Sequence, residues 1–206
     1  YTGRTVSESE GMMGRTLTFD RRTAVTAARG VFWREGFENA SIPDLESATG
    51  LSRSSIYNAF GSKRGLFDQT VQSYLDEVVR PRLGELQGEH VAADALARYL
   101  DGLRAAFSGR SPAAELGCLL INAAGAPIAT DPDVARVIVA YRQELRDAIG
   151  RGIDAARPDA EASERGLFAD TVTGLVIAAF ALVRVDRESA VGMLTTARET
   201  SSTGSQ

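Results

Sequence analysis

Cysteine, histidine and lysine are scarce in this 206-residue sequence, which has one of each: Cys118, His90 and Lys63. A single cysteine cannot form an internal disulfide. No cluster of cysteines or carboxylates with metal-ligand spacing surrounds His90, so we expect no metal site, no cofactor and no histidine-based catalytic triad. No glycine-rich phosphate loop follows a strand either. We therefore expect no catalytic residues.

Long apolar runs are also missing. The longest, from Val172 to Val183, is interrupted by Thr173 and Gly174 and is shorter than the roughly 20 residues of a membrane span. No apolar run near the start resembles a signal peptide. The sequence predicts a cytoplasmic protein with no membrane partner.

Alternating strand patterns and fixed-period repeats are absent, whereas helical spacing of apolar residues occurs in nearly every segment. The predicted fold is all-α. By composition and periodicity, residues 1–18 and 200–206 are expected to be flexible tails, residues 19–62 a small helical head and residues 63–199 a larger helical bundle.

Charge is distributed unevenly between the two ends. The net charge of the whole chain is −4. Residues 1–64 carry 9 basic and 7 acidic side chains, whereas residues 65–206 carry 14 and 20. The positive first segment favours, weakly, a nucleic-acid partner at that end.

Capping residues and glycines mark the expected helix ends in the first 80 residues. The first helix should run from Arg21 to Glu35 and stop at Gly36. The second should start at Ser41, with a capping box to Asp44, and stop at Gly50. Ser52 and Ser62 should cap the next two helices, 53–60 and 63–79, the latter ending before Pro81. Later helices are expected at 91–107, 115–129, 132–156 (with Gly150 and Gly152 as candidate kinks), 163–185 and 187–199.

The helix expected at 53–60 has two distinct faces. Ile56, Ala59 and Phe60 share the inward face, which leaves a short outward face rich in hydrogen-bond donors: Arg53, Ser54, Tyr57 and Asn58, with Ser55 at its border. Such a face suits the major groove of DNA, where arginine pairs with guanine and asparagine with adenine. An ordinary solvent-facing helix surface is the alternative interpretation.

Lys63 and Arg64 begin the following helix, where a cation opposes the helix dipole. Free backbone N–H groups and two cations at one helix start would suit a DNA phosphate. Extension of both side chains into water is the alternative.

This segment resembles the TetR family of one-component transcriptional regulators. The match spans about 45 residues without a gap and rests on these: Ala27, Ala28, Val31, Phe32, Gly36, Phe37, Ser41, Ile42, Asp44, Leu45, Ala48, Gly50, Leu51, Ser52, Ile56, Tyr57, Phe60 and Lys63. The sequence departs from the family pattern at Trp33, Pro43 and Ala59. The family often has histidine at the position of Ala59.

The resemblance implies a protomer of nine helices, in which three bind DNA and the fourth links them to a ligand-sensing bundle. By position, it assigns phosphate contacts to Ser41, Tyr57 and Lys63 and base or backbone readout to Arg53, Ser54 and Ser55. Together with the cap residue and the rest of the outward face, the predicted DNA-binding set is Ser41, Ser52, Arg53, Ser54, Ser55, Tyr57, Asn58 and Lys63.

The helix expected at 163–185 is apolar on almost every side in its second half, so it must be covered all round. The resemblance suggests that the same helix of a second protomer covers part of it. The predicted homodimer interface is Val172, Leu175, Val176, Ala179, Leu182, Val183, Val191 and Leu194, with Gly174, Ala178 and Ala181 allowing close approach. A helix inside a monomeric bundle is the alternative.

Candidate effector-binding residues lie on the bundle helices, and each also suits plain core packing: Phe67, Tyr74, Tyr99, Leu103, Phe107, Leu120, Asn122 and Tyr141. Asn122 and Tyr141 would need polar partners if buried, and a ligand could be one. Cys118 is either a redox or electrophile sensor or an inert buried thiol.

These observations predict a dimeric repressor that binds a palindromic operator in double-stranded DNA and is released by a small-molecule effector. Two alternatives remain open. One is an all-α small-molecule binder or enzyme with an incidental basic head, and the other is an activator or nucleoid-type factor without a ligand.

Overall fold

The computed structural model describes residues 20–202, and the described chain is helical with no strand, which confirms the all-α prediction. In chain order the elements are α1 (Arg21–Asn39), α2 (Ile42–Thr49), α3 (Arg53–Phe60), α4 (Lys63–Tyr74), a π-helical turn η1 (Leu75–Val79), α5 (Arg80–Gln87), α6 (Ala95–Ser108), α7 (Pro112–Leu116), α8 (Leu119–Ala124), a 3₁₀ turn η2 (Pro127–Thr130), α9 (Pro132–Ala156), α10 (Ala162–Leu182) and α11 (Arg187–Ser202). If α4 to α5 is taken as one rod and α7 with α8 as one broken helix, the described part has the nine helices expected of the family.

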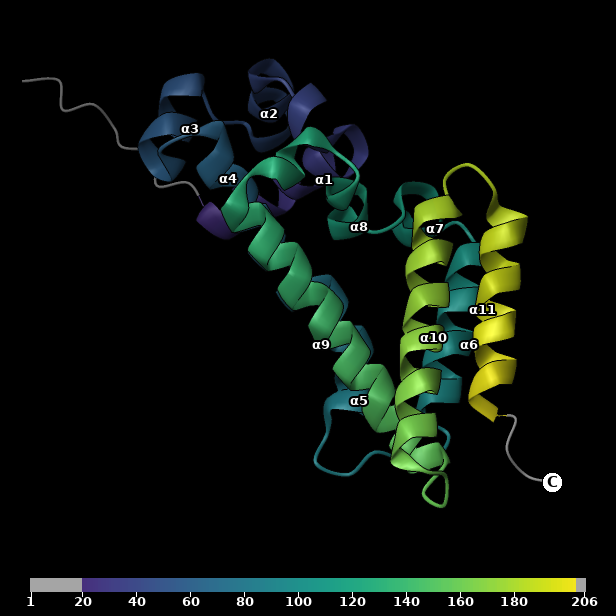
Figure 1. The fold of residues 1–206 in the computed structure, drawn as a ribbon. Helices are drawn as coiled ribbons and strands as arrows, with labels where there is room; N and C mark the ends of the chain where they lie inside the picture. The colour runs from purple at the N-terminus through teal and green to yellow at the C-terminus, as the bar shows by residue number, and fades with distance from the viewer. Residues whose placement is uncertain (1–19, 203–206) are drawn as a thin grey trace, which may run out of the picture.

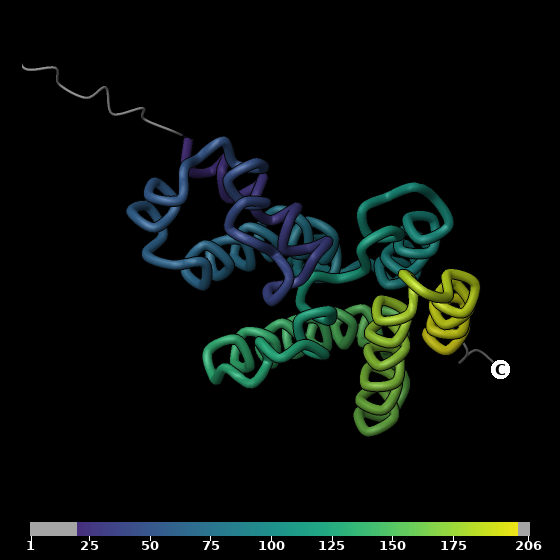
Figure 2. The backbone as a smooth tube through the Cα atoms, turned by 90° about the horizontal axis from the view of Figure 1, so that it is seen from above, coloured from purple at the N-terminus to yellow at the C-terminus, as the bar shows by residue number. Residues whose placement is uncertain are grey.

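Helices α1 to α3 form a head at one end of the molecule (Figure 1). The rod α4–η1–α5 and the long helix α9 run away from it, and α6, α10 and α11 stand beside them as a bundle. Figure 2 shows the same division from above, with α10 and α11 at the side away from α3. The head packs on the rod mainly through α1 and α4.

The short helices of the head begin and end at the predicted residues. Ser41 and Asp44 form the expected capping box of α2, Gly50 ends α2 in the left-handed region, and Ser52 caps α3. Gly36, with a φ of 78°, interrupts α1 at the predicted stop, and one further turn follows to Asn39. Local capping therefore determines this part of the fold.

The rod does not end before Pro81, so that prediction is wrong. The helix passes through Pro81 to Gln87 because η1 widens the turn directly before it: the Arg80 N–H bonds to the Leu75 carbonyl, five residues back. Since proline has no N–H and its ring displaces a carbonyl of the preceding turn, the π turn accommodates it.

The helices after the rod depart from prediction in two places. Helix α6 starts at Ala95 rather than near Val91, and the helix expected at 115–129 is divided into α7, α8 and η2. The break falls at Gly117, whose φ is 70° and whose backbone lies so close to Phe180 that a Cβ would sit 2.9 Å from its carbonyl oxygen.

Helix α9 is continuous, so Gly150 and Gly152 do not kink it. Gly152 instead permits close packing, because a Cβ there would lie 2.7 Å from Leu96 Cβ and 2.9 Å from Leu86 Cδ2. At Gly150 the nearest atom would be 3.7 Å away. The two glycines thus differ in their structural role.

Helix α11 extends to Ser202, so residues 200–202 are not the tail that composition predicts. The buried Arg157 explains the extension, since its guanidinium donates to the carbonyls of Thr200 (3.1 Å) and Ser201 (3.3 Å). The predicted tails at 1–18 and 203–206 lie outside the described residues.

Two stretches, Pro112–Thr130 and Ala162–Leu182, are long and apolar enough to span a membrane by length and composition. The first is divided into three short helices here. The second, α10, packs one side against α9 and α11, with Val172, Val176 and Ala179 fully buried, and 33% of its most apolar window is buried inside the protomer.

Candidate nucleic-acid interface

Helix α3 is held by buried side chains on one face and by hydrogen bonds at its N-terminus. Ile56 is fully buried and Phe60 nearly so, which points the opposite side of the helix outward. Ser52 Oγ accepts from the Ser55 N–H, and Glu46 accepts from the Arg53 N–H at 2.5 Å. These contacts to α2 and within the turn set the orientation of α3.

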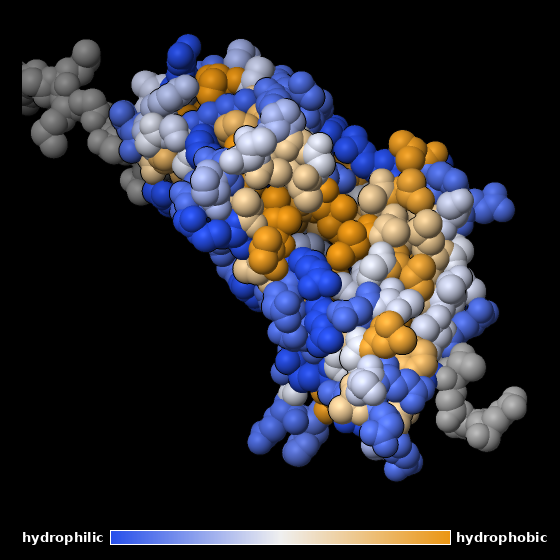
Figure 3. Space-filling view, viewed as in Figure 1, coloured by the Kyte–Doolittle hydropathy of each residue, from blue (hydrophilic) through white to orange (hydrophobic). Residues whose placement is uncertain are grey.

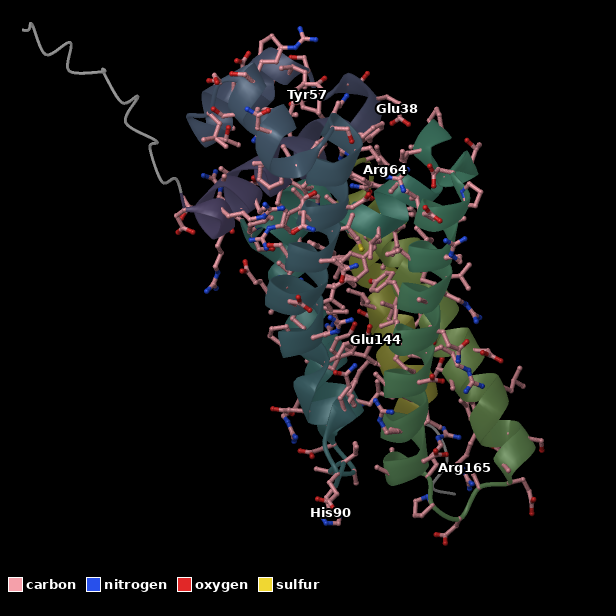
Figure 4. All side chains as sticks on the ribbon, turned by 90° about the vertical axis from the view of Figure 1, so that its left-hand side faces the viewer. Glu38, Tyr57, Arg64, His90, Glu144 and Arg165 are labelled. Carbon is pink, nitrogen blue, oxygen red and sulfur yellow. The ribbon has the colours of Figure 1, made fainter. Side chains whose placement is uncertain are left out.

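The outward face of α3 is polar and accessible, as predicted. Arg53, Ser54 and Asn58 are exposed, and Tyr57 is 38% exposed although it is aromatic. The Arg53 guanidinium lies 5.6 Å from the centre of the Tyr57 ring. Figure 4 shows Tyr57 at one end of the molecule and His90 at the opposite end, so this face lies far from the outer end of the bundle.

The predicted serines are engaged in local hydrogen bonds. Ser52 Oγ lies 2.9 Å from Ser54 Oγ and 3.0 Å from Ser55 Oγ. The Ser41 hydroxyl donates to Asp44, and this bond together with the Ser41 N–H lowers the pKa of the Asp44 carboxyl. A DNA contact by Ser41 or Ser52 would therefore be additional to a capping role.

The two cations at the start of α4 differ. Lys63 folds back, with Nζ 3.4 Å from the Glu38 carbonyl oxygen and 4.7 Å from the Phe37 ring centre, and partial burial lowers its pKa. Arg64 binds the carboxylates of Asp68 and Asp131, so its guanidinium is neither open to a DNA phosphate nor extended into water in this structure. The helix-dipole conflict is answered by two acidic partners instead.

Arg21 is a basic residue of the head that the sequence pattern missed. It begins α1, yet its guanidinium reaches the C-terminal end of α3, 4.7 Å over the Phe60 ring, and donates to the Ala59 carbonyl at 2.9 Å. A cation thus stands beside Ala59, where the family often has histidine. A separation of 38 residues left no local signal for it.

The head contacts the bundle at the segment that contains η2. Glu38 accepts from the Ile128 N–H at 2.6 Å, and Arg64 pairs with Asp131 three residues later. A groove of about 660 Å³ lies alongside, lined in part by Trp33, Phe37 and Leu119. Figure 3 shows apolar surface in the hollow between head and bundle.

Four of the predicted effector residues line one small cavity in the bundle: Tyr74, Tyr99, Leu103 and Tyr141. Its volume is about 20 Å³, room for about one water. Burial raises the pKa of all three tyrosines. The fully buried Cys118 donates to Tyr141 Oη at 3.5 Å.

The other predicted effector residues lie elsewhere. Phe67 packs edge-on against Phe32 between α1 and α4, and Phe107 packs against Phe180. Asn122 is half-buried and donates to the Leu116 carbonyl at 2.7 Å, and Leu120 is buried. Arg82, which sequence reasoning missed, lines both the small cavity and a second one of about 270 Å³ between α5 and α6.

The predicted dimer residues are mostly interior, which corrects that set. Five are buried within the protomer and cannot contact a partner in this conformation: Val172, Val176, Ala179, Val183 and Leu194. Leu175, Leu182 and Val191 are half-buried. The outer side of α10 instead carries a stripe at spacings of three and four residues: Leu167, Thr171, Gly174, Ala178 and Ala181. Val185 follows in the turn after α10.

Among residues 20–202, no three histidine, cysteine, aspartate or glutamate side chains converge in a way that could hold a metal ion. The chemistry of the α3 face is that of hydrogen-bond donors, a cation and an aromatic ring. Such groups bind phosphate oxygens and base edges.

Sequence comparison finds relatives with the same head. Residues 24–70 match the family model for bacterial regulatory proteins of the tetR family. An uncharacterized HTH-type transcriptional regulator of Bacillus subtilis strain 168, YezE, is 32% identical over 150 residues, covering 72% of this chain and 76% of the relative. The HTH-type transcriptional repressor ComR of Escherichia coli K12 is 34% identical over 110 residues, 53% of this chain and 51% of ComR.

Solved structures share the fold over most of the chain. A cysteine mutant of the TetR family transcriptional regulator CifR, complexed with 26-base-pair double-strand operator DNA, superposes with a TM-score of 0.73 at 30% identity, covering 90% of this chain and 98% of CifR. A TetR transcriptional regulator from Chloroflexus aurantiacus has a TM-score of 0.65 at 26% identity, with coverage of 87% and 90%. This chain therefore belongs to the TetR family of bacterial regulatory proteins and is a DNA-binding transcriptional regulator.

Proposed function

We propose that the protein is a repressor that binds a palindromic operator as a homodimer and is released by a small-molecule effector. The observation that carries the proposal is the exposed Arg53, Tyr57 and Asn58 face of α3, on a helix held by Ile56 and Phe60. The operator complexes of CifR support DNA as the partner. The names of ComR and of the E. coli repressor BdcR support repression. A DNA partner also favours a cytoplasmic location.

The outer stripe of α10 supports the homodimer. Leu167 on α10 is 66% exposed, and Val185 in the turn after it is 82% exposed. Between them, Gly174, Ala178 and Ala181 are small enough for two helices to approach closely. Two heads related by a two-fold axis would read two half-sites about one helical turn apart, or a little more.

The rod supports coupling between an effector and the head. Tyr74, Val78 and Val79 line the small cavity and lie in or next to η1, within the same rod that begins at Lys63 beside the head. A π turn is one residue wider than an α turn, so a ligand that expands the cavity would act on a readily altered part of the rod. A hundredfold loss of DNA affinity requires only about 2.7 kcal/mol of coupling.

Selection of bound fragments from random DNA with the purified full chain tests the proposal. An inverted repeat should emerge, and its affinity should fall steeply with salt because phosphate contacts release counterions. Fragments without a repeat would indicate a nucleoid-type factor. Weak binding with no salt dependence would favour the alternative of a small-molecule binder with an incidental head.

A further inference from the structure

The cavity of about 270 Å³ between α5 and α6 has an unbalanced charge at its rim. Its lining includes Arg82, Glu85 and Arg98. Arg98 is paired with Glu85 at 2.9 Å and also with Asp94. Arg82, by contrast, forms no hydrogen bond or ion pair with residues 20–202. The rim therefore presents one uncompensated guanidinium.

Tyr99 supplies a second polar group to the lining of this cavity. Together with Leu103 and Arg82 it lines both the larger cavity and the small one behind it. Its hydroxyl has no hydrogen-bond partner in the described chain. A planar guanidinium and a buried phenol that line the same two cavities are suited to the two oxygens of a carboxylate.

The remaining lining is apolar or small: Pro81, Gly102, Leu103 and Ala106. It offers surface for a hydrocarbon body but no second cation for a doubly charged group. The volume is close to the lower end, about 300 Å³, of the range for ligand sites. The site is therefore suited to a compact ligand with one charged end.

We propose that the effector is a small monocarboxylic acid, whose carboxylate binds Arg82 and Tyr99 and whose apolar part lies along Leu103 toward the small cavity. This inference rests on the proposed function and specifies the ligand class. A charged head at Arg82 leaves the apolar end next to Val78 and Val79, the residues of η1 that line the inner cavity. Ligand size would then determine how strongly the π turn is displaced.

The test is calorimetric titration of the full chain with hexanoate, octanoate and phenylacetate, each beside its primary amide, which keeps the shape and removes the charge. At least one acid should bind at least tenfold more tightly than its amide. Arg82→Gln should abolish that preference and leave amide binding unchanged. Arg98→Gln is the matched control on the same rim and should retain the preference, since Arg98 already has two carboxylate partners.

Four outcomes would overturn the inference: equal binding of acid and amide, no binding of any acid at millimolar concentration, a preference that survives Arg82→Gln, or competition by inorganic phosphate, which would indicate a general anion site. DNA affinity without ligand is measured on the same variants. If the unmodified chain binds DNA but shows no preference for an acid, only the proposed ligand class is rejected. If the unmodified chain does not bind DNA, the proposed function is rejected.

Discussion

Arg64 and Asp131 join the first turn of α4 to the cap of α9 through a bidentate ion pair. Both Asp131 oxygens contact the guanidinium, and Oδ1 also accepts from the N–H groups of Asp133 and Val134. Asp131 thus caps one helix while it holds the start of another. Figure 4 shows Arg64 of the rod near Glu38, the head residue that binds the same segment.

Arg64→Gln should loosen this junction without unfolding the head. We expect amide hydrogen exchange to accelerate several-fold in residues 126–134, because the α9 cap loses the cation that orients it. Arg136→Gln is the matched control, since Arg136 forms an exposed pair with Asp133 within α9 and such pairs contribute little. Equal amide exchange rates for residues 126–134 in both variants would contradict the role of Arg64 in this junction.

Acid should weaken the same contact. The Arg64 guanidinium lowers the pKa of the Asp131 carboxyl to about 2. Because the folded-state pKa is below the unfolded one of about 3.9, the ion pair stabilises the fold at neutral pH and is lost as pH falls from about 4 to 2. Urea unfolding should show Asp131→Asn less stable than the unmodified chain at pH 7, and the difference should shrink on acidification. A constant difference would contradict this.

Arg53→Ala should weaken operator binding by about 1–3 kcal/mol and relax discrimination at one base pair. The helix itself should persist because its cap and buried side do not involve the guanidinium. Fluorescence anisotropy with the selected operator and its point variants measures both effects. Arg110→Ala, an exposed arginine between α6 and α7, is the control for lost charge and should bind as the unmodified chain does.

Gly152→Ala and Gly150→Ala should change stability in opposite directions although they are two residues apart. The new methyl at 152 would collide with Leu96 and Leu86, at a cost of about 1–3 kcal/mol. At 150 the methyl has ordinary contacts, and higher helix propensity should stabilise by up to about 1 kcal/mol. The denaturant midpoints of the two variants measure these changes in stability. Equal shifts would mean that α9 and α6 are less closely packed than described.

In the proposed homodimer, Leu167→Glu should shift the equilibrium toward monomer. Leu167 is on the outer stripe of α10, and a charge there would be buried without a partner in the dimer. Val139→Glu is the control, because Val139 on α9 is exposed to the same extent, 66%. Analytical ultracentrifugation of the two variants measures the fraction of dimer in each. Dissociation by the Val139 variant alone would place the interface on α9.

The sequence by itself determined the parts of this protein that depend on neighbours along the chain. Ser41, Ser52, Gly50 and Gly61 delimit α2 and α3 at the predicted residues, since caps and left-handed glycines act within one turn. The inward position of Ile56 and the outward position of Tyr57 follow from helical period alone. Which side of α3 is exposed and polar was therefore predictable.

Contacts between distant segments were decided only by the tertiary structure. Asp131 neutralises Arg64 from 67 residues away, and Arg157 extends α11 from 43 residues away. The apolar pattern of α10 could not distinguish the side that faces its own bundle from the exposed side, because both sides carry apolar residues. The periodicity of apolar residues predicts which side chains are buried, whereas tertiary packing determines which segments cover them.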